Sequence, residues 1–417
     1  MKIRKLFALF ALTVACFSCS NYKDGEIHCR IEGTVPDSTY DIMLLAPEGT
    51  NLRSVEPIAI PVKDCKFAFD LYVDEIAPYE LVPKVEYDRS SWFSGTFFAE
   101  EGTVNLTFYH YEKVGECPTV KSETPNNKRY LQLMAAEDSI MDPLYKEQDS
   151  LIDAGKRDSP QMIELFEQLN STDDEQKKEE LRKQADKLYD SGEAYTPEYY
   201  AFQSKYKEAL KDRDRFFIDY IRGDRSLVGL FVLKNQMQWS RDSSNDSIYT
   251  VLYNDVYRSL FPGHSLSKYI EMWIGSRNIK VGGRYVDFSA PDLSGTQHTL
   301  SKEIAGKVAL IDLWASWCGP CRRVSKSMIP IYEKYKERGF TVIGVARENK
   351  RENLEQAIVT DGYPWLNLLE LNDENKIWVK YGIENAAGNA ILVDRDGTIL
   401  AIYPTAEEVE RILQEKL

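Results

Sequence analysis

The pattern of apolar and polar positions divides most of the chain into three regions. From about residue 25 to 111, short apolar runs alternate with turn residues, as is typical of β-strands. Lys66–Val73 alternates most regularly, with Phe67, Phe69 and Leu71 on one face. Strands at this spacing predict a small β-sandwich within residues 20–115. The expected strands are Ile27–Ile31, Tyr40–Leu45, Lys66–Val73, Tyr79–Val85, Thr96–Ala99 and Thr103–Tyr109.

Residues 116–277 place apolar positions at the helical period among many charges. The segment Thr172–Lys187 is mostly Asp, Glu, Lys and Gln, which indicates a solvent-exposed helix. The denser apolar stretches Phe216–Ile221 and Leu227–Leu233 are expected to be buried. We therefore predict helical hairpins that space or pack the flanking domains. The alternatives are a dimerisation arm or a surface that captures substrate.

Residues 278–417 change the pattern again. Val308–Trp314 and Phe340–Ala346 are apolar without alternation, as expected of strands that are buried on both faces. A helix is expected between them, and the pair Asp396-Gly397 indicates a hairpin between two later strands. The remaining expected elements are a helix over Cys318–Arg338, strands over Ala390–Asp394 and Thr398–Tyr403, and a last helix over Ala406–Lys416 that begins with a capping box at Thr405 and Glu408. The fold class is thus multidomain α+β, with a C-terminal α/β domain.

The first residues carry the signature of export. Lys2, Arg4 and Lys5 precede the apolar run Leu6–Ala15, which is shorter than the ~18 apolar residues that a membrane span needs. We therefore predict a secretory signal in residues 1–19.

A small residue directly before Cys16, and again before Cys19, resembles the lipobox of bacterial lipoproteins. This resemblance implies lipidation of Cys16 or Cys19, a membrane contact by the lipid anchor only, and a position on the periplasmic side of the cell envelope. The residues upstream favour Cys16, whereas Cys19 gives the longer apolar run, so both remain candidates.

Composition excludes several classes of function. The 417 residues include 52 Lys and Arg against 66 Asp and Glu, a formal net charge of −14, which argues against nucleic-acid binding. Most of this excess lies before residue 278, because residues 278–417 carry 18 Lys and Arg against 20 Asp and Glu. None of the four histidines lies near another in the sequence, so we expect no local metal site, and no cofactor is expected.

The candidate chemistry lies in Trp317-Cys318-Gly319-Pro320-Cys321, between an expected strand and an expected helix. Two cysteines three residues apart on a first helical turn share one face, so their sulfurs can bond. Cys318 would occupy the helix N-terminus, where unpaired N–H groups and the helix dipole stabilise a thiolate. Pro320 suits the first turn. We therefore expect Cys318 to attack and Cys321, deeper in the helix, to resolve the mixed disulfide.

The neighbouring residues bear on this interpretation. Arg322, Arg323 and Lys326 add positive charge that should favour the thiolate. A zinc site would need two more ligands, and the sequence has no second C-x-x-C or histidine pair. A peroxidatic cysteine is not supported either, because Ala315 stands where such proteins carry Thr or Ser.

Residues 311–321 resemble thioredoxin, while Ala290–Gly295 and a helical insert at about 348–381 resemble the extracytoplasmic TlpA/ResA-type thiol–disulfide oxidoreductases. The resemblance covers the last third of the chain. It implies a thioredoxin-like domain that exchanges protein disulfides and receives electrons from an inner-membrane relay protein. Gly33, the Cys65–Phe69 strand and the turn at 97–102 resemble the β-domain that is fused to thioredoxin-like lipoproteins of Bacteroidetes.

The resemblance also assigns roles by position. Asp312 matches the buried carboxylate behind the dithiol, which implies proton transfer with Cys321 and a pKa raised by burial. Trp317 matches the residue that shields the sulfurs. Gly319 and Pro320 form the dipeptide of thioredoxin, which favours a reductase.

Two positions depart from the family pattern. Gly388 stands where relatives carry a cis-proline that faces the disulfide. We expect a trans bond at 387–388 and a looser grip on the substrate backbone, because a cis bond before a non-proline residue costs about 3 kcal/mol. Val324 and Lys326 replace the Glu and Pro that are frequent in relatives, so the usual proline kink should be absent from a straighter helix.

Three cysteines remain. In an oxidising compartment Cys29 and Cys65 are the most suitable pair, which leaves Cys117 without a partner; buried thiols are the alternative.

The leading hypothesis is a lipid-anchored thiol–disulfide reductase. One alternative is a disulfide isomerase that forms a homodimer through the helical region. The other is a surface lipoprotein that binds a partner or glycan through its β-domain and carries a vestigial dithiol.

Overall fold

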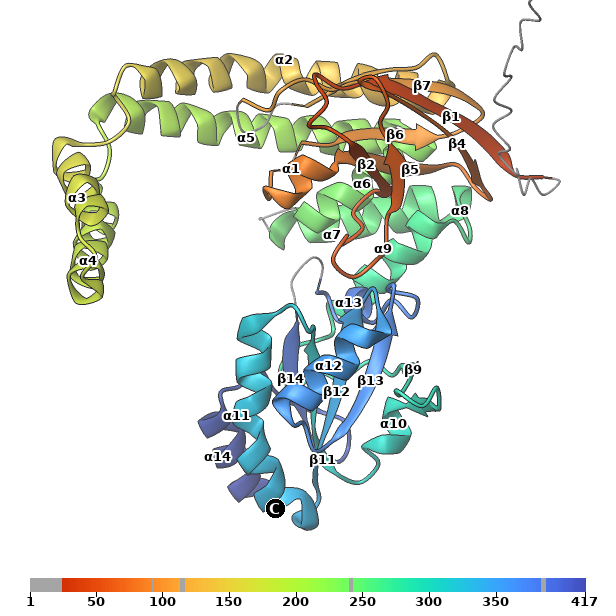
Figure 1. The fold of residues 1–417 in the computed structure, drawn as a ribbon, viewed down its shortest axis with the longest axis vertical. Coiled ribbons are helices and arrows are strands. Elements are labelled where there is room, and N and C mark those ends of the chain that lie inside the picture. Colours follow the sequence, from red (N-terminus) through yellow and green to blue (C-terminus); the bar gives the residue numbers. More distant parts are fainter. Residues whose placement is uncertain (1–24, 92, 113–116, 240–242, 384–387) are drawn as a thin grey trace, which may run out of the picture.

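The computed structural model describes residues 25–417 except residues 92, 113–116, 240–242 and 384–387. The predicted signal and both lipidation candidates, Cys16 and Cys19, therefore lie outside the described residues. Figure 1 shows the N-terminal sheets and the long helices at one end and the C-terminal α/β domain at the other. No described helix is long and apolar enough to cross a membrane.

The N-terminal region consists of two four-stranded sheets, in the orders β4-β1-β7-β8 and β3-β2-β5-β6. One apolar core, which includes Ile31, Leu45 and Phe97, draws side chains from both sheets. The short strands β3 and β8 and the helix α1 were not predicted. The elements are β1 Ile27–Thr34, β2 Ile42–Pro47, β3 Ile58–Pro61, β4 Lys66–Val73, β5 Ala77–Pro83, α1 Lys84–Asp88, β6 Gly95–Ala99, β7 Gly102–Thr107 and β8 Thr119–Lys121.

The expected Cys29–Cys65 disulfide is wrong. In the antiparallel register of β1 and β4, Cys29 lies opposite Leu71, whereas Cys65 precedes the far end of β4. Six residues of strand span about 20 Å, which is too far for a disulfide. Cys29, Cys65 and Cys117 are all thiols. Cys29 is fully buried, and burial raises its pKa to about 11.

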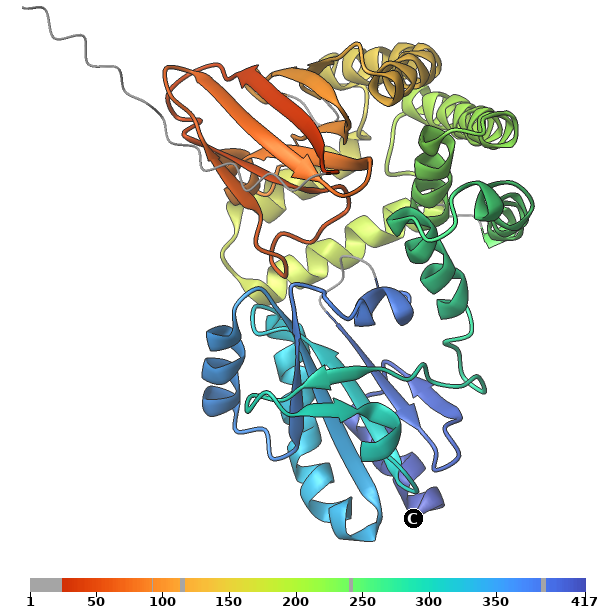
Figure 2. The same ribbon diagram turned by 90° about the vertical axis from the view of Figure 1, so that its right-hand side faces the viewer.

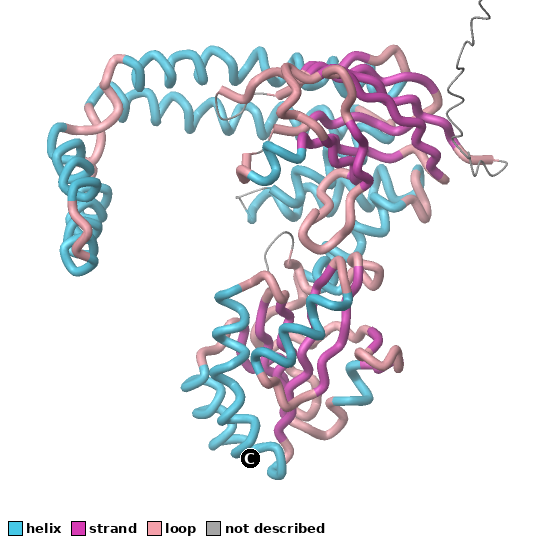
Figure 3. Tube along the Cα trace, viewed as in Figure 1, coloured by secondary structure: helices cyan, strands magenta, loops and turns pink. Residues whose placement is uncertain are grey.

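The middle region is helical, as predicted. Two long helices, α2 and α5, lie side by side, and α3 and α4 form a hairpin at their far end (Figures 1 and 3). Leu181 is the buried residue of the charged helix α4, which confirms that this helix is solvent-exposed. The helices are α2 Pro125–Asp153, α3 Pro160–Ser171, α4 Glu175–Ser191, α5 Pro197–Gly223, α6 Leu227–Trp239, α7 Ser243–Leu252, a π-helical turn Tyr253–Tyr257, α8 Arg258–Leu260 and α9 Ser265–Ser276.

The C-terminal domain is built on a five-stranded sheet in the order β13-β12-β11-β14-β15. The strands β11, β12 and β13 are parallel, whereas β14 and β15 are antiparallel to their neighbours. All seven residues of the central strand β11 are buried, which confirms the prediction. The elements are β9 Ser289–Pro291, β10 Gln297–Thr299, α10 Leu300–Glu303, β11 Val308–Trp314, α11 Gly319–Tyr335, β12 Phe340–Glu348, α12 Arg351–Asp361, β13 Leu366–Leu371, α13 Ile377–Lys380, β14 Asn389–Val393, β15 Ile399–Ile402 and α14 Ala406–Lys416.

Residues of β11 alternate between the two apolar cores of this domain. Leu310 and Trp314 face a core that includes residues of α11, α12 and α14, whereas Ile311 and Leu313 face a core that includes residues of α10 and α13. The sheet is therefore covered by helices on both faces, and the first core places α11 over the face to which Asp312 belongs.

Two expectations about this domain need correction. The predicted helical insert at 348–381 contains a strand, β13, which extends the sheet by pairing with β12. We expected no proline kink in this helix, because Lys326 stands where relatives carry Pro. However, Pro330 lies inside α11, one turn later. A proline nitrogen cannot donate to the carbonyl four residues earlier, so the hydrogen-bond ladder of α11 is interrupted there.

Candidate active site

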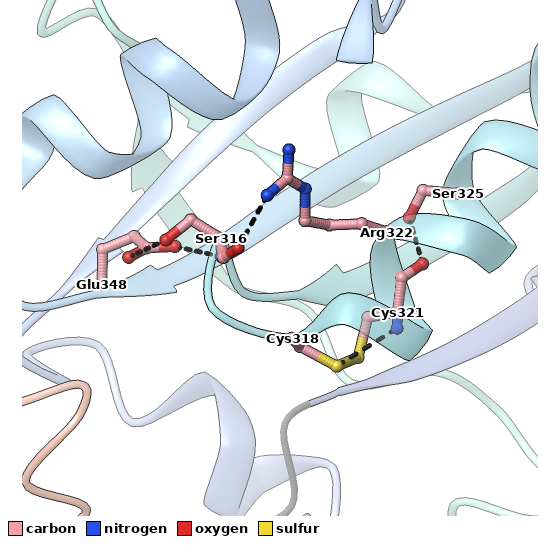
Figure 4. The surroundings of a disulfide bond; sticks show 6 residues. All are labelled: Ser316, Cys318, Cys321, Arg322, Ser325 and Glu348. Atoms are coloured by element: carbon pink, nitrogen blue, oxygen red, sulfur yellow. Dashed lines mark hydrogen bonds between the residues drawn. A yellow bond between two sulfur atoms is a disulfide. The ribbon is translucent and has the colours of Figure 1, made fainter. Parts of the chain in front are cut away.

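Cys318 and Cys321 form a disulfide at the N-terminus of α11, with their Cα atoms 5.3 Å apart. Cys318 is the N-cap residue, and its Sγ accepts a hydrogen bond from the backbone N–H of Cys321 at 3.1 Å (Figure 4). The N–H of Cys318 donates to the carbonyl of Ala315 at 3.0 Å. A sulfur at this position lies where the unpaired N–H groups of the helix stabilise negative charge, as the sequence predicted.

The two cysteines differ in exposure. Cys318 is only 6% exposed, whereas Cys321 is half-buried. The end of the domain that carries Cys318 faces the N-terminal sheets and the middle helices (Figures 1 and 2). In the folded chain Cys318 is thus buried, although the sequence pattern places it at a helix end.

Asp312 lies on β11, on the face covered by α11, and is 4% exposed. Burial raises the pKa of its carboxyl to about 7, while a hydrogen bond with the Ser325 hydroxyl has the opposite effect. The hydroxyl of Ser325 donates to the carbonyl of Cys321 at 3.1 Å. The hydroxyl has a single hydrogen, so an ionised Asp312 competes with the Cys321 carbonyl for it. This chain of groups links the carboxyl to the Cys321 backbone.

A buried carboxylate holds the loop before the disulfide. Glu348, at the end of β12, accepts hydrogen bonds from the N–H of Ser316 at 2.5 Å and from its hydroxyl at 2.8 Å (Figure 4). Arg322 donates to the carbonyl of Ser316 at 3.2 Å. Glu348 has no exposed surface, and burial raises its pKa. The loop that leads to Cys318 is therefore held at Ser316 by both Glu348 and Arg322.

The positive charge beside the cysteines is largely offset. Arg322 donates to both oxygens of Asp361 at 2.6 and 2.9 Å, and Lys326 lies 2.7 Å from the same carboxylate. These contacts, above all the hydrogen bond from Arg322, hold the pKa of Asp361 well below its usual range. Two of the three cations that were expected to favour the thiolate are thus paired with one anion, so their effect on the sulfur is smaller than predicted.

Gly388 directly precedes β14 and lies beside the end of β11 that leads to the disulfide. A Cβ atom at Gly388 would lie 1.9 Å from the carbonyl oxygen of Leu313, so this backbone position has no room for a side chain. The peptide bond 387–388 involves residue 387, which lies outside the described residues, so its expected trans state stays a prediction.

Sequence reasoning missed four residues of this site: Ser325, Glu348, Asp361 and Arg53, whose contact with Trp317 is described below. A signal existed for Glu348, because it ends a buried parallel strand next to the strand that leads to the cysteines. The described residues contain no group of three or more His, Cys, Asp or Glu side chains that could hold a metal ion.

Comparison with known proteins identifies the domain that carries the disulfide. Residues 281–402 match the model of the AhpC/TSA family. The thiol–disulfide oxidoreductase ResA of Geobacillus kaustophilus is 27% identical over 139 residues, which are 33% of this chain and 78% of the relative. The thiol:disulfide interchange protein DsbE of Allochromatium vinosum is 32% identical over 114 residues, which are 27% of this chain and 60% of the relative.

A solved structure extends the comparison. The thioredoxin domain of a thiol–disulfide oxidoreductase from Bacteroides vulgatus is 27% identical, with a TM-score of 0.31 over 33% of this chain and 96% of that structure. By the family model and the two curated relatives, the C-terminal domain is thioredoxin-like, and the relatives that it matches are named thiol–disulfide oxidoreductases, which confirms the predicted enzyme class.

Proposed function

We propose that the chain is an exported, lipid-anchored reductase of protein disulfides. The observation that carries this proposal is the Cys318–Cys321 disulfide at the N-terminus of α11, with the buried Asp312 behind it. The sulfurs themselves carry the two electrons, so the reaction needs no bound cofactor.

The proposed reaction has two exchange steps. The Cys318 thiolate attacks one sulfur of the substrate disulfide, which forms a mixed disulfide and releases the other substrate sulfur as a thiolate. Cys321 then attacks the Cys318 sulfur, which releases the second substrate thiol and leaves Cys318–Cys321 oxidised. An external dithiol restores the reduced pair by the same two steps in reverse.

Asp312 supports the second step in this proposal. A thiol must lose its proton before it attacks, and a carboxyl with a pKa of about 7 is matched to a reaction near neutral pH. In this proposal the proton passes between the Cys321 thiol and Asp312 through a water, because the Ser325 hydroxyl donates to the Cys321 backbone carbonyl and not to its sulfur.

The cellular setting follows from the signal-like N-terminus. We propose that Cys16 or Cys19 carries the lipid and that the inner-membrane reductant of this enzyme type supplies the electrons. The two N-terminal sheets would then form a β-sandwich of the kind fused to thioredoxin-like lipoproteins. Labelling of cells with a fatty-acid analogue tests the anchor: Cys16→Ala or Cys19→Ala, whichever is the acceptor, should abolish the label.

The reduction potential of the Cys318–Cys321 pair tests the direction. A value near about −270 mV is expected for a reductase, whereas a value near about −120 mV would indicate an oxidant. Cys318→Ser should abolish reduction of insulin, while Cys321→Ser should accumulate mixed disulfides with substrates in cells. Full turnover by Cys318→Ser would contradict the proposal. Complete absence of trapped partners would favour a binding lipoprotein with a vestigial dithiol.

A further inference from the structure

The loop between β2 and β3, residues 48–57, reaches from the N-terminal sheets to the redox end of the C-terminal domain (Figures 1 and 2). The carbonyl of Asn51 orders this loop, because it accepts hydrogen bonds from the N–H groups of Ser54 and Val55 at 2.9 Å each. The N–H of Glu56 donates to Oδ1 of Asn372, just after β13, at 3.3 Å. The loop is thus held by contacts in both domains.

Arg53 in this loop lies over the ring of Trp317, the residue before the first redox cysteine. Its guanidinium carbon is 5.4 Å from the ring centroid, within the range of a cation–π contact. Beside this contact lies a cavity of about 260 Å³, whose apolar lining is Leu52, Val82, Phe93 and Trp317. Three of these four residues belong to the N-terminal region, so the β-domain forms most of the apolar wall.

The position of the cavity determines what can enter it during exchange. In a mixed disulfide the Cα atoms of the two cysteines lie about 4.4–6.8 Å apart, and each further residue of the partner adds about 3.8 Å. Because Trp317 lines the cavity and directly precedes Cys318, a residue next to the substrate cysteine is the natural candidate to enter it. The volume is below the roughly 300–1,000 Å³ of cavities that hold drug-sized ligands, so it suits a single side chain.

We propose that this cavity receives a large apolar side chain next to the disulfide-bonded cysteine of a polypeptide substrate. The inference rests on the proposed function, to which it adds a substrate preference supplied by the N-terminal domain. The electron balance is that of the exchange above: the reduced cysteines lose two electrons and form their disulfide, and the two substrate sulfurs leave as thiols.

Charge in the cavity strengthens the preference for an apolar group. Glu80, on β5, also lines the cavity, and burial raises the pKa of its carboxyl to about 7, an effect increased by the nearby Glu48. At pH 8 the Glu80 carboxylate would repel an acidic substrate side chain, which would also lose its hydration on entry. Arg53 lines the cavity too, but its guanidinium is held over the Trp317 ring. An aromatic or aliphatic side chain meets neither penalty.

Two cyclic peptides test the inference. They are identical except that the residues flanking each cysteine are Phe in one and Asp in the other. Full-length reduced protein is mixed with each peptide at pH 8, and the second-order rate constant of a single turnover is measured. We expect the Phe peptide to react at least about tenfold faster. Bis(2-hydroxyethyl) disulfide, which is too small to reach the cavity, serves as the reference substrate.

Variants connect this preference to the cavity. Leu52→Asp places a charge in its wall and Ser94→Phe fills it, so both should bring the ratio of the two peptide rates close to one. Ile58→Asp makes the same apolar-to-acidic change at a residue that is 41% exposed and not part of the lining, so it should keep the ratio. Both lining residues belong to the proposed binding site, so each peptide rate is compared with the rate of the same variant on the reference disulfide; only Ile58→Asp should leave that reference rate unchanged.

The outcomes separate the two proposals. Equal rates for the two peptides, or a Phe preference that persists in folded Leu52→Asp and Ser94→Phe, would overturn the inference and leave the reductase proposal intact. Failure of the wild-type protein to reduce all three disulfides would overturn the reductase proposal itself. Melting temperatures show which variants are folded. If Leu52→Asp does not fold, the result with Ser94→Phe decides the test.

Discussion

Asp312 is buried behind the disulfide, and its ionisation should affect both stability and exchange. The unfolded chain releases this proton near the ordinary value of 3.8, whereas the folded protein holds it up to about 7. Between these pH values the folded state binds more protons than the unfolded state. The free energy of unfolding must therefore fall as pH rises through this window.

Asp312→Asn should remove that dependence. A tenfold change in proton affinity corresponds to about 1.4 kcal/mol, so the variant should exceed the wild type in stability by up to about 4 kcal/mol at pH 8. At pH 4 the two proteins should be similar. Urea unfolding at both pH values measures the difference; a wild-type advantage at pH 8 would contradict the assigned pKa.

The same substitution should slow exchange. If Asp312 moves the Cys321 proton, Asp312→Asn should lower the rate of mixed-disulfide resolution at least about tenfold at pH 7. The formation of the mixed disulfide by Cys318 should change less. Rapid-quench measurement of the two steps separates these effects, and an equal loss in both would indicate a merely structural role.

Glu348 should control stability through the loop before Cys318. Glu348→Gln replaces one of its two acceptor oxygens by an NH₂ group, so one of the two hydrogen bonds from Ser316 is lost. We expect a loss of about 1–3 kcal/mol in the free energy of unfolding, because the group is fully buried. The control is Glu355→Gln, which removes an exposed ion pair with Arg351 on α12 and should change stability by less than about 0.5 kcal/mol.

At the scale of elements, β11 and β14 meet at a position that admits only glycine in the observed backbone. Gly388→Ala would bring a Cβ atom to 1.9 Å from the Leu313 carbonyl oxygen, so one strand must move. We expect a loss of about 2–4 kcal/mol and slower exchange, because this contact lies beside the disulfide loop.

A second glycine provides the control for this prediction. Gly275, in α9, has open space where a Cβ would lie, so Gly275→Ala should be neutral or stabilise by up to about 1 kcal/mol. Thermal unfolding of both variants compares them directly. Equal melting temperatures for Gly388→Ala and Gly275→Ala would contradict the close approach of the two strands.

The elements that sequence reasoning located best have a strong local signal. The bounds of β11 and α14 agree with the predicted ones, since β11 is a continuous apolar run and α14 begins at the Thr405 cap, whose hydroxyl accepts from the Glu408 N–H. The strands β3, β8, β9, β10 and β13 were missed. The first four have only three or four residues each. The strand β13 lies in a segment whose flanks are helical, so only pairing with a neighbouring strand decides its state.

At the scale of the whole molecule, a buried ion pair joins the N-terminal sheets to the helices. Lys234 of α6 is 4% exposed in its side chain, and its ammonium nitrogen lies 2.8 Å from the carboxylate of Glu48, the first residue after β2. Its ammonium group also lies over the rings of Phe231 and Tyr269. The cation thus compensates a carboxylate that the fold has removed from water.

Lys234→Met should destabilise the protein by about 3 kcal/mol or more at pH 8, because Glu48 would remain buried without its partner. The double variant Lys234→Met/Glu48→Met should recover most of this loss. Lys268→Met, at an exposed lysine of α9, is the control and should have little effect. Chemical unfolding of the wild type, Lys234→Met, Glu48→Met and the double variant gives the coupling free energy; a double variant as unstable as Lys234→Met alone would contradict it.

The sequence alone determined the redox pair and its local setting. A strand, a tight turn and a helix N-terminus are encoded within eleven residues, and two cysteines three apart on a helical turn must share a face. The continuous apolar run of β11 likewise required cover on both faces. These features depend on neighbours in the chain, so a pattern can predict them.

The tertiary structure decided everything that depends on distant segments. It placed Glu348 on Ser316, paired Arg322 and Lys326 with Asp361, separated Cys29 from Cys65, and brought Arg53 over Trp317. Each of these contacts depends on strand register or on how the domains pack. No local pattern encodes a charge pair or a cavity wall whose residues lie far apart in the sequence. Such a contact stabilises the protein only when the fold has brought both segments together.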